Sequence, residues 1–195
     1  VYKRQSTGAE VDLRWLDAQL KSHYELKTKY LGPDPATGHL QEIRVLNRII
    51  AWTETGITYE ADPRHAELLV TELNLEEAKG VTTPGSKDDV AKAAAENEAS
   101  DHKPLSPAQT TQYRGITARL NFLAQDRPDL LYPSKEASRR MSSPCAGDWA
   151  LLKRVGRYLV RVPRMRQTFE WQALPEILAT FVDSDWAGCL SLIHI

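Results

Sequence analysis

The feature that most constrains the fold is the stretch from Lys87 to Asp101, which is charged, rich in alanine and without a long apolar face. Such a segment buries too little apolar surface to offset the entropy lost on ordering. We therefore expect an exposed linker over residues 81–105, with room for a short helix at Asp89 to Asn97. This linker divides the 195-residue chain into two halves.

The half before the linker begins with a predicted helix and hairpin. Residues 11–24 carry apolar side chains at spacings of three and four, which is typical of one face of a helix. The segments Glu42 to Leu46 and Arg48 to Trp52 are rich in apolar and β-branched residues, and Ile57 to Tyr59 follows a turn. This pattern predicts a β-hairpin.

A second helix is predicted from Asp62-Pro63, because Asp caps helices well and Pro fits the first helical position. A stripe with helical spacing follows, made of Ala66, Leu69, Val70 and Leu73. Gly80, directly after Lys79, is the predicted end of this helix. His65 lies near the helix start without a partner at metal-ligand spacing, which favours a surface histidine.

The half after the linker predicts three helices. The first carries a stripe at Tyr113, Ile116, Leu120 and Leu123 and stops at Arg127-Pro128-Asp129. The second runs from Pro133 to Met141. The third begins at Ser143-Pro144, ends before Pro163 and has one apolar face, formed by Trp149, Leu152, Val155 and Leu159.

Positive charge is concentrated in this second half. Residues 106–170 hold twelve Lys and Arg against five Asp and Glu, so the segment carries +7 although the whole chain carries −1. The third helix places Lys153, Arg157 and Arg161 four residues apart, with Arg154 beside them. This row is either a solvated helix face or a surface that follows nucleic-acid phosphates. The residues alone leave both readings open.

A short strand near the end of the chain, Phe181 to Gly188, places Asp183 and Asp185 on one face. Two carboxylates so arranged are either ordinary solvated acids or ligands for Mg²⁺, which prefers oxygen donors. The chain has no glycine-rich phosphate loop, no Cys/His cluster with metal-ligand spacing and no serine-nucleophile motif. It also has no apolar run near the length that spans a bilayer, so we expect no membrane partner. The two cysteines mildly favour a reducing compartment.

The two ends share a pattern that is unusual for a natural protein. The codons GTG TAT AAG AGA CAG encode Val1 to Gln5, and their reverse complement encodes Leu190 to His194. We therefore expect residues 1–5 and 190–195 to derive from a sequencing adapter and exclude them from reasoning about the fold.

Three stretches together resemble the Pol polyprotein of copia-type LTR retrotransposons, where reverse transcriptase runs into RNase H. The first is Gln112-Tyr113-Arg114-Gly115 through Leu130, and the second is Met141 to Leu159. The third is Asp183-Ser184-Asp185-Trp186-Ala187-Gly188. Their order and spacing also agree with the family, and Leu16 to Gly32 and Thr83-Pro84 resemble it more loosely.

The resemblance implies an α+β fold with a β-hairpin plus helix, an exposed linker, a mainly helical thumb- or connection-like region and the first strand of a truncated RNase H-like domain. It implies the end of a palm/thumb-like region at 6–80, the linker at 81–105, the basic helical region at 106–166 and the start of RNase H at 167–189.

The resemblance also implies a function for these parts. The intact parent is a reverse transcriptase and ribonuclease H that uses Mg²⁺, with Asp183 as the first RNase H carboxylate and metal ligand. Because its other metal ligands are missing here, we expect this fragment to be inactive. We expect it to bind an RNA or DNA template–primer and an RNA–DNA hybrid, and to connect with other segments of the polyprotein. The residues expected to contact nucleic acid are Lys153, Arg154, Arg157, Arg161, Arg139 and Arg140.

Two other interpretations of the chain stay open. The chain is alternatively a non-catalytic helical module that binds nucleic acid or another protein, or a decayed element. The resemblance implies an intracellular setting, in a cytoplasmic particle or the nucleus.

Overall fold

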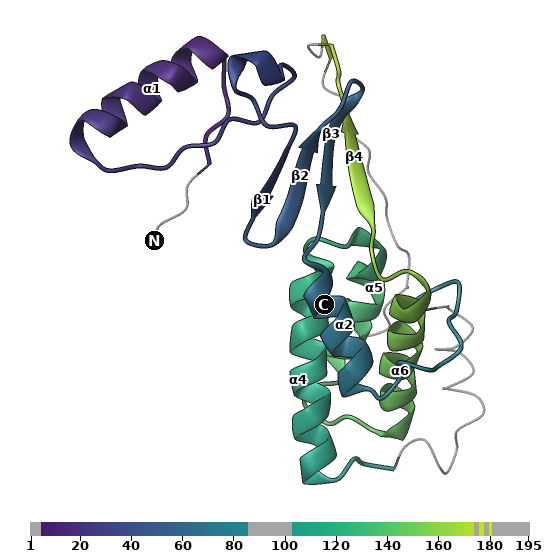
Figure 1. Cartoon of the computed structure of the whole chain (residues 1–195). Coiled ribbons are helices and arrows are strands. Elements are labelled where there is room, and N and C mark those ends of the chain that lie inside the picture. Colours follow the sequence, from purple (N-terminus) through teal and green to yellow (C-terminus); the bar gives the residue numbers. More distant parts are fainter. Residues whose placement is uncertain (1–4, 86–102, 174–175, 178–179, 181–195) are drawn as a thin grey trace.

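The computed structural model describes residues 5–85, 103–173, 176–177 and 180. The fold is α+β, as predicted, with an antiparallel sheet and a separate group of helices. Figure 1 shows α1 (Glu10–His23) on the β1 side of the sheet. The remaining helices form a helical body below the strands in this view. The linker helix proposed at Asp89 to Asn97 and the strand at Phe181 to Gly188 lie outside the described residues.

The sheet has the order β1-β2-β3-β4, with every neighbouring pair antiparallel. Its strands are β1 (Glu42–Val45), β2 (Arg48–Trp52), β3 (Gly56–Glu60) and β4 (Arg166–Glu170). The predicted hairpin is confirmed, and Leu46 and Asn47 turn it with φ of 50° and 65°. Positive φ at both turn residues suits the right-handed twist of the two strands.

Strand β4 was not predicted from the sequence. Residues 166–170 pair with β3 along its whole length, from Glu60↔Arg166 to Gly56↔Glu170. The strand is short and mostly polar, so its own residues carry little strand signal. The predicted domain boundary between residues 166 and 167 therefore falls inside a strand.

Helix α2 (Pro63–Glu72) begins as predicted, with the Asp62 carboxylate accepting a hydrogen bond from the Arg64 N–H at 3.1 Å. The prediction that it ends at Gly80 is wrong. The helix ends at Glu72 because Asn74 adopts φ of 54°, a left-handed conformation that terminates helices. A Cβ atom on Gly80 would lie 2.7 Å from the Arg161 Cβ, so this glycine permits close packing instead.

The other helices are α4 (Pro107–Ala124), α5 (Leu131–Arg139) and α6 (Ala146–Arg161), with the short 3-10 turns η1 (Pro35–Thr37) and η2 (Pro128–Leu130). The predicted stripe on α4 is confirmed, and all four of its residues are buried. The predicted cap of α6 at Ser143-Pro144 is wrong. Cys145 caps the helix because its backbone N–H donates to the Asp148 carboxylate at 2.9 Å.

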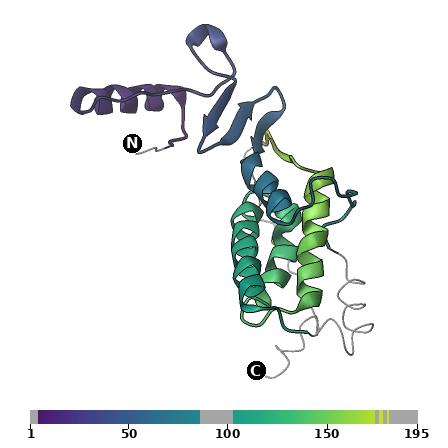
Figure 2. The same cartoon turned by 60° about the horizontal axis from the view of Figure 1, so that its bottom comes forward.

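The core lies among the helices, where α2, α4, α5 and α6 pack together (Figure 2). Among the described residues, this cluster includes Ala61 but no residue of β1–β4. The described ends of the predicted linker depart from the prediction of exposure, since Val81 and Leu105 pack against the core. Helix α1 departs from expectation in the other direction. The predicted helix is confirmed, but none of its residues is buried, so its apolar stripe does not pack into the core.

Candidate nucleic-acid interface

The basic row of α6 lies on a helix whose other face is fixed in the core. Leu152, Val155 and Leu159 are each at most 2% exposed, so the helix cannot rotate without losing this contact. Burying one such side chain fully contributes about 1.5–3 kcal/mol. The apolar face therefore holds the basic row in one orientation.

The residues of this row differ in their surroundings. Lys153 and Arg161 are exposed, whereas Arg154 and Arg157 are half-buried. Arg157 donates from Nε to the Lys79 carbonyl at 2.8 Å, and Arg154 donates from Nη2 to the Thr83 hydroxyl at 2.9 Å. These two arginines attach the loop after α2 to α6. A backbone carbonyl is neutral, so the bond to Lys79 leaves the positive charge of Arg157 in place.

The two predicted cations of α5 lie beside acids. The Arg139 Nη1 atom is 3.4 Å from the Glu136 carboxylate, and the Arg140 Nε atom is 3.7 Å from the Asp148 carboxylate. Carboxylates at these distances offset part of the charge that nucleic acid would meet.

Arg127 has a structural role that the sequence did not reveal. Its side chain is 2% exposed, donates to the Asp129 carboxylate at 2.7 Å and also donates to the Val162 carbonyl at 3.2 Å. Tyr158 donates to the same carboxylate at 2.8 Å. Burial tends to raise the pKa of Asp129, but the hydrogen bonds from Arg127 and Tyr158 hold it below its usual value. Arg127 therefore joins the end of α4 to the end of α6.

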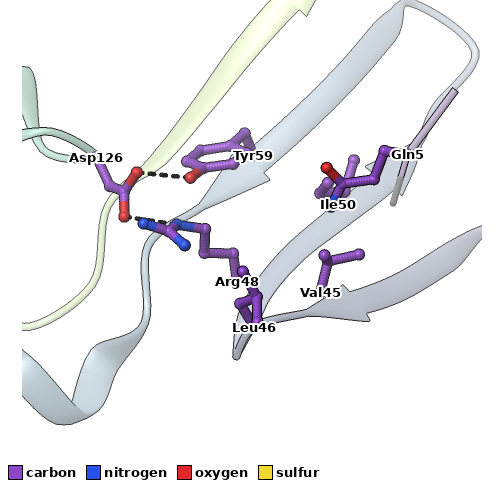
Figure 3. Close-up of a pocket in the computed structure, with 7 residues that line it drawn as sticks. All are labelled: Gln5, Val45, Leu46, Arg48, Ile50, Tyr59 and Asp126. Carbon is purple, nitrogen blue, oxygen red and sulfur yellow. Dashed lines mark hydrogen bonds and ion pairs between the residues drawn. The ribbon is translucent and has the colours of Figure 1, made fainter. Parts of the chain in front are cut away.

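A second polar junction connects the sheet to the helical body (Figure 3). Asp126 accepts hydrogen bonds from the Arg48 Nε at 2.7 Å and from the Tyr59 hydroxyl at 2.6 Å. Burial, and then the bond to Asp126, raise the pKa of Tyr59 to about 12. Gln167 on β4 donates to the Asp126 carbonyl at 2.8 Å.

This junction borders a depression of about 430 Å³, whose other lining residues are Gln5, Val45, Leu46 and Ile50. Figure 3 shows the Arg48 and Tyr59 side chains converging on Asp126 at one side of it. Because the carboxylate already accepts from both residues, it is poorly placed to take a proton from a substrate. The depression lies at the junction between the sheet and the helices.

Asp183 and Asp185 lie outside the described residues, so their geometry with Mg²⁺ stays a prediction. Within the described ranges, no group of three or more His, Cys, Asp or Glu side chains is arranged to hold a metal ion. In the same part of the chain, no helix combines the length and apolarity required to cross a membrane.

Parts of the chain are similar in sequence to known proteins. The retrovirus-related Pol polyprotein of transposon RE2 from Arabidopsis thaliana is 34% identical over 120 residues, which is 62% of this chain and 8% of that polyprotein. The corresponding polyprotein of transposon RE1 is 32% identical over the same length. The resemblance to copia-type Pol polyproteins is confirmed.

An uncharacterized mitochondrial protein of the same plant is 36% identical over 81 residues, covering 42% of this chain and 33% of that protein. No family model matches the chain, and no solved structure matches it. Since the chain spans 8% of the length of the two Pol polyproteins, it corresponds to a small segment of them.

Proposed function

We propose that this chain is a segment of a retrotransposon Pol polyprotein that binds the template–primer and connects the polymerase to RNase H. In this proposal the intact parent is an RNA-directed DNA polymerase and ribonuclease H, and this segment alone lacks a complete active site. Its partners are the nucleic acid and the remaining segments of the polyprotein. The similarity to two Pol polyproteins supports the parent, and the α6 surface supports the role.

The observation that carries the proposal is the row formed by Lys153, Arg157 and Arg161. The row lies on a helix oriented by its buried opposite face, and Arg157 is further held by the Lys79 carbonyl. Cations carried on a helix that is oriented in this way are already aligned with successive phosphates, and each one that meets a phosphate releases counterions. Arginine adds two-pronged contacts that suit phosphate oxygens.

The direct experiment measures binding of a fluorescent RNA–DNA primer–template duplex by anisotropy. The variant Lys153→Gln/Arg161→Gln removes two exposed cations without touching the contact between Arg157 and Lys79. The matched control is Lys27→Gln/Lys29→Gln, which removes the same charge from exposed positions after α1. We expect weaker binding for the α6 variant and little change for the control. Equal effects of the two variants would show that only net charge matters and would contradict the proposal.

The catalytic part of the proposal concerns the parent. There Mg²⁺ would be held partly by Asp183, and the metal would activate water to cleave RNA in a hybrid. We expect the purified chain to leave an RNA–DNA hybrid intact in Mg²⁺. Cleavage that depends on Mg²⁺ and disappears in Asp183→Asn would instead show that the chain carries a working site.

The second candidate is a non-catalytic helical module that binds nucleic acid or another protein. The continuous helical core, which contains no strand residue among those described, favours this candidate as a folding unit. The two candidates predict different sequences on either side of this segment. Sequencing the source locus beyond both ends separates them, because only the first requires polymerase carboxylates upstream and further RNase H carboxylates downstream.

A further inference from the structure

Glu60 is a buried carboxylate at the point where the sheet meets the helical body. It is the last residue of β3 and is 3% exposed. The alternate residues Gly56 and Thr58 of β3 are buried as well, so Glu60 continues a row of buried positions along this inner strand. A buried charge is costly unless it is paired, which predicts a cation beside it.

Two arginines supply that pairing. Arg164 donates from Nε to one carboxylate oxygen, and Arg166 lies 3.3 Å from the other through Nη2. The hydrogen bond from Arg164 is the main reason that the pKa of Glu60 is held below its usual value. Both arginine side chains stay more than half exposed, at 58% and 55%. One carboxylate balances one of the two charges, so an accessible positive charge remains.

A third arginine belongs to the same row of the sheet. The cross-strand partners Arg44↔Ile49, Ile49↔Glu60 and Glu60↔Arg166 run across all four strands. Residues paired in this way point to the same face of a sheet. Arg44 is exposed. Together with Arg164 at its end, the row holds three arginines against one glutamate.

The other acids of this face lie farther from the helical body. Glu42 belongs to the next row, opposite Ala51, and Glu170 lies opposite Gly56 at the far end of the sheet. Glu42 still acts on Arg164 electrostatically, although more weakly than Glu60. The row that contains Glu60 is therefore the positive end of the face.

Arg164 and Arg166 follow the basic row of α6 closely along the chain. Helix α6 leads into β4 through a short connection, and Figure 1 shows the two following one another in space. Lys153 and Arg161 are about 12 Å apart along the helix axis. Arg161 and Arg166 are at most about 17 Å apart along the chain. The path from Lys153 through Arg161 to Arg166 is shorter than one turn of a nucleic-acid duplex, about 34 Å. Arg44 lies three strands farther across the sheet.

We propose that the phosphate-binding surface extends from α6 onto the sheet, where Arg44, Arg164 and Arg166 bind the backbone of the same duplex. Glu60 is a positioning residue, because it fixes Arg164 and Arg166 without contacting nucleic acid. The inference rests on the proposed function and adds a second set of contacts to it. It also assigns β4 a role, since that strand brings Arg166 beside Glu60.

The test compares salt dependence of duplex binding for Arg44→Gln/Arg166→Gln and the wild-type chain. Arg164 still pairs with Glu60 in this variant, so the fold should persist, and a thermal melt verifies this. We expect the slope of log affinity against log salt concentration to become shallower by about two, since two phosphate contacts are lost. The charge-preserving variant Arg44→Lys/Arg166→Lys should restore the slope, and Lys27→Gln/Lys29→Gln should not alter it.

The outcomes separate this inference from the proposed function. If the sheet variant keeps the wild-type slope while Lys153→Gln/Arg161→Gln loses slope, the surface ends on α6 and the inference is wrong. If neither variant changes the slope, both the inference and the proposed function are wrong. A slope that the lysine variant fails to restore would show that the arginines act through structure rather than through charge.

Discussion

The hydroxyl group of Tyr59 on β3 donates a hydrogen bond to the carboxylate of Asp126, just after α4, over 2.6 Å. This bond spans the boundary between the sheet and a helical core that, among the described residues, includes none from the strands. Arg48 donates to the same carboxylate, so a polar junction connects two parts of the molecule. The orientation of the sheet therefore depends on hydrogen bonds and ion pairs.

Removing the Tyr59 hydroxyl should weaken this junction. We expect Tyr59→Phe to lower the free energy of unfolding by about 1–2 kcal/mol, because a hydrogen bond to a charged group is lost. Urea denaturation measures the change. Tyr24→Phe is the control, since Tyr24 is 65% exposed and should change stability by less than about 0.5 kcal/mol. Equal stability of Tyr59→Phe and the control would show that the bond contributes nothing.

The same bond predicts a dependence on alkaline pH. The pKa of Tyr59 is raised from its ordinary value of 10.0 to about 12, so folding favours the protonated phenol. Its contribution is complete below pH 10 and is lost as the pH rises toward 12. Other tyrosines titrate in this range too, so the informative quantity is the difference from Tyr59→Phe. Melting temperatures of the two proteins should converge between pH 10 and 12, and a constant gap would contradict the assignment.

Arg127 should be among the most sensitive positions in the helical body. Arg127→Ala leaves the Asp129 carboxylate without its cation and removes the bond to the Val162 carbonyl. Loss of one partner from a buried ion pair costs about 3–5 kcal/mol. Arg119→Ala breaks the more exposed pair with Glu72 and should cost at most about 1 kcal/mol. Similar unfolding free energies for both variants would refute the role of Arg127.

These residues show what the sequence could and could not predict. The stripes on α2, α4 and α6 were predictable because helical periodicity is local, and Asp62-Pro63 marked the start of α2 through local capping chemistry. Arg127 was visible only as part of a helix stop, since its burial depends on the end of α6, more than thirty residues later. Glu60 could have been noticed as an acid in line with Gly56 and Thr58 on one face of β3. An acid that is buried at such a position requires a cation beside it.

Strand β4 was missed because its pairing is a long-range property. Helix α6 brings residues 166–170 beside β3, although they lie more than a hundred residues after β3 in the sequence. A short polar segment does not show in its own sequence which strand it will pair with. The reading of α6 as a nucleic-acid surface came from charge spacing, and the structure adds the orientation and the bonds of Arg157. The metal site expected at Asp183 lies outside the described residues and stays a prediction.

A pair of glycine substitutions tests the placement of β4. An added Cβ on Gly56 would lie 2.1 Å from the backbone oxygen of Phe169, so Gly56→Ala should push β4 away from β3. In contrast, no atom lies within 4 Å of the corresponding position on Gly115, inside α4. Gly115→Ala should therefore stabilise the chain by about 0.5–1 kcal/mol. Hydrogen exchange of residues 166–170 should rise in Gly56→Ala alone, and unchanged protection would contradict the β3–β4 pairing.

In the proposed function, the fixed helix α6 presents a row of cations to the backbone of a nucleic-acid duplex. The most direct measurement is the affinity of the wild-type chain for an RNA–DNA primer–template duplex across a series of salt concentrations. Three phosphate contacts from Lys153, Arg157 and Arg161 predict a slope of log affinity against log salt of about −3, or steeper if the sheet also binds. Affinity that does not change with salt, or no binding at low salt, would contradict the proposed role of α6.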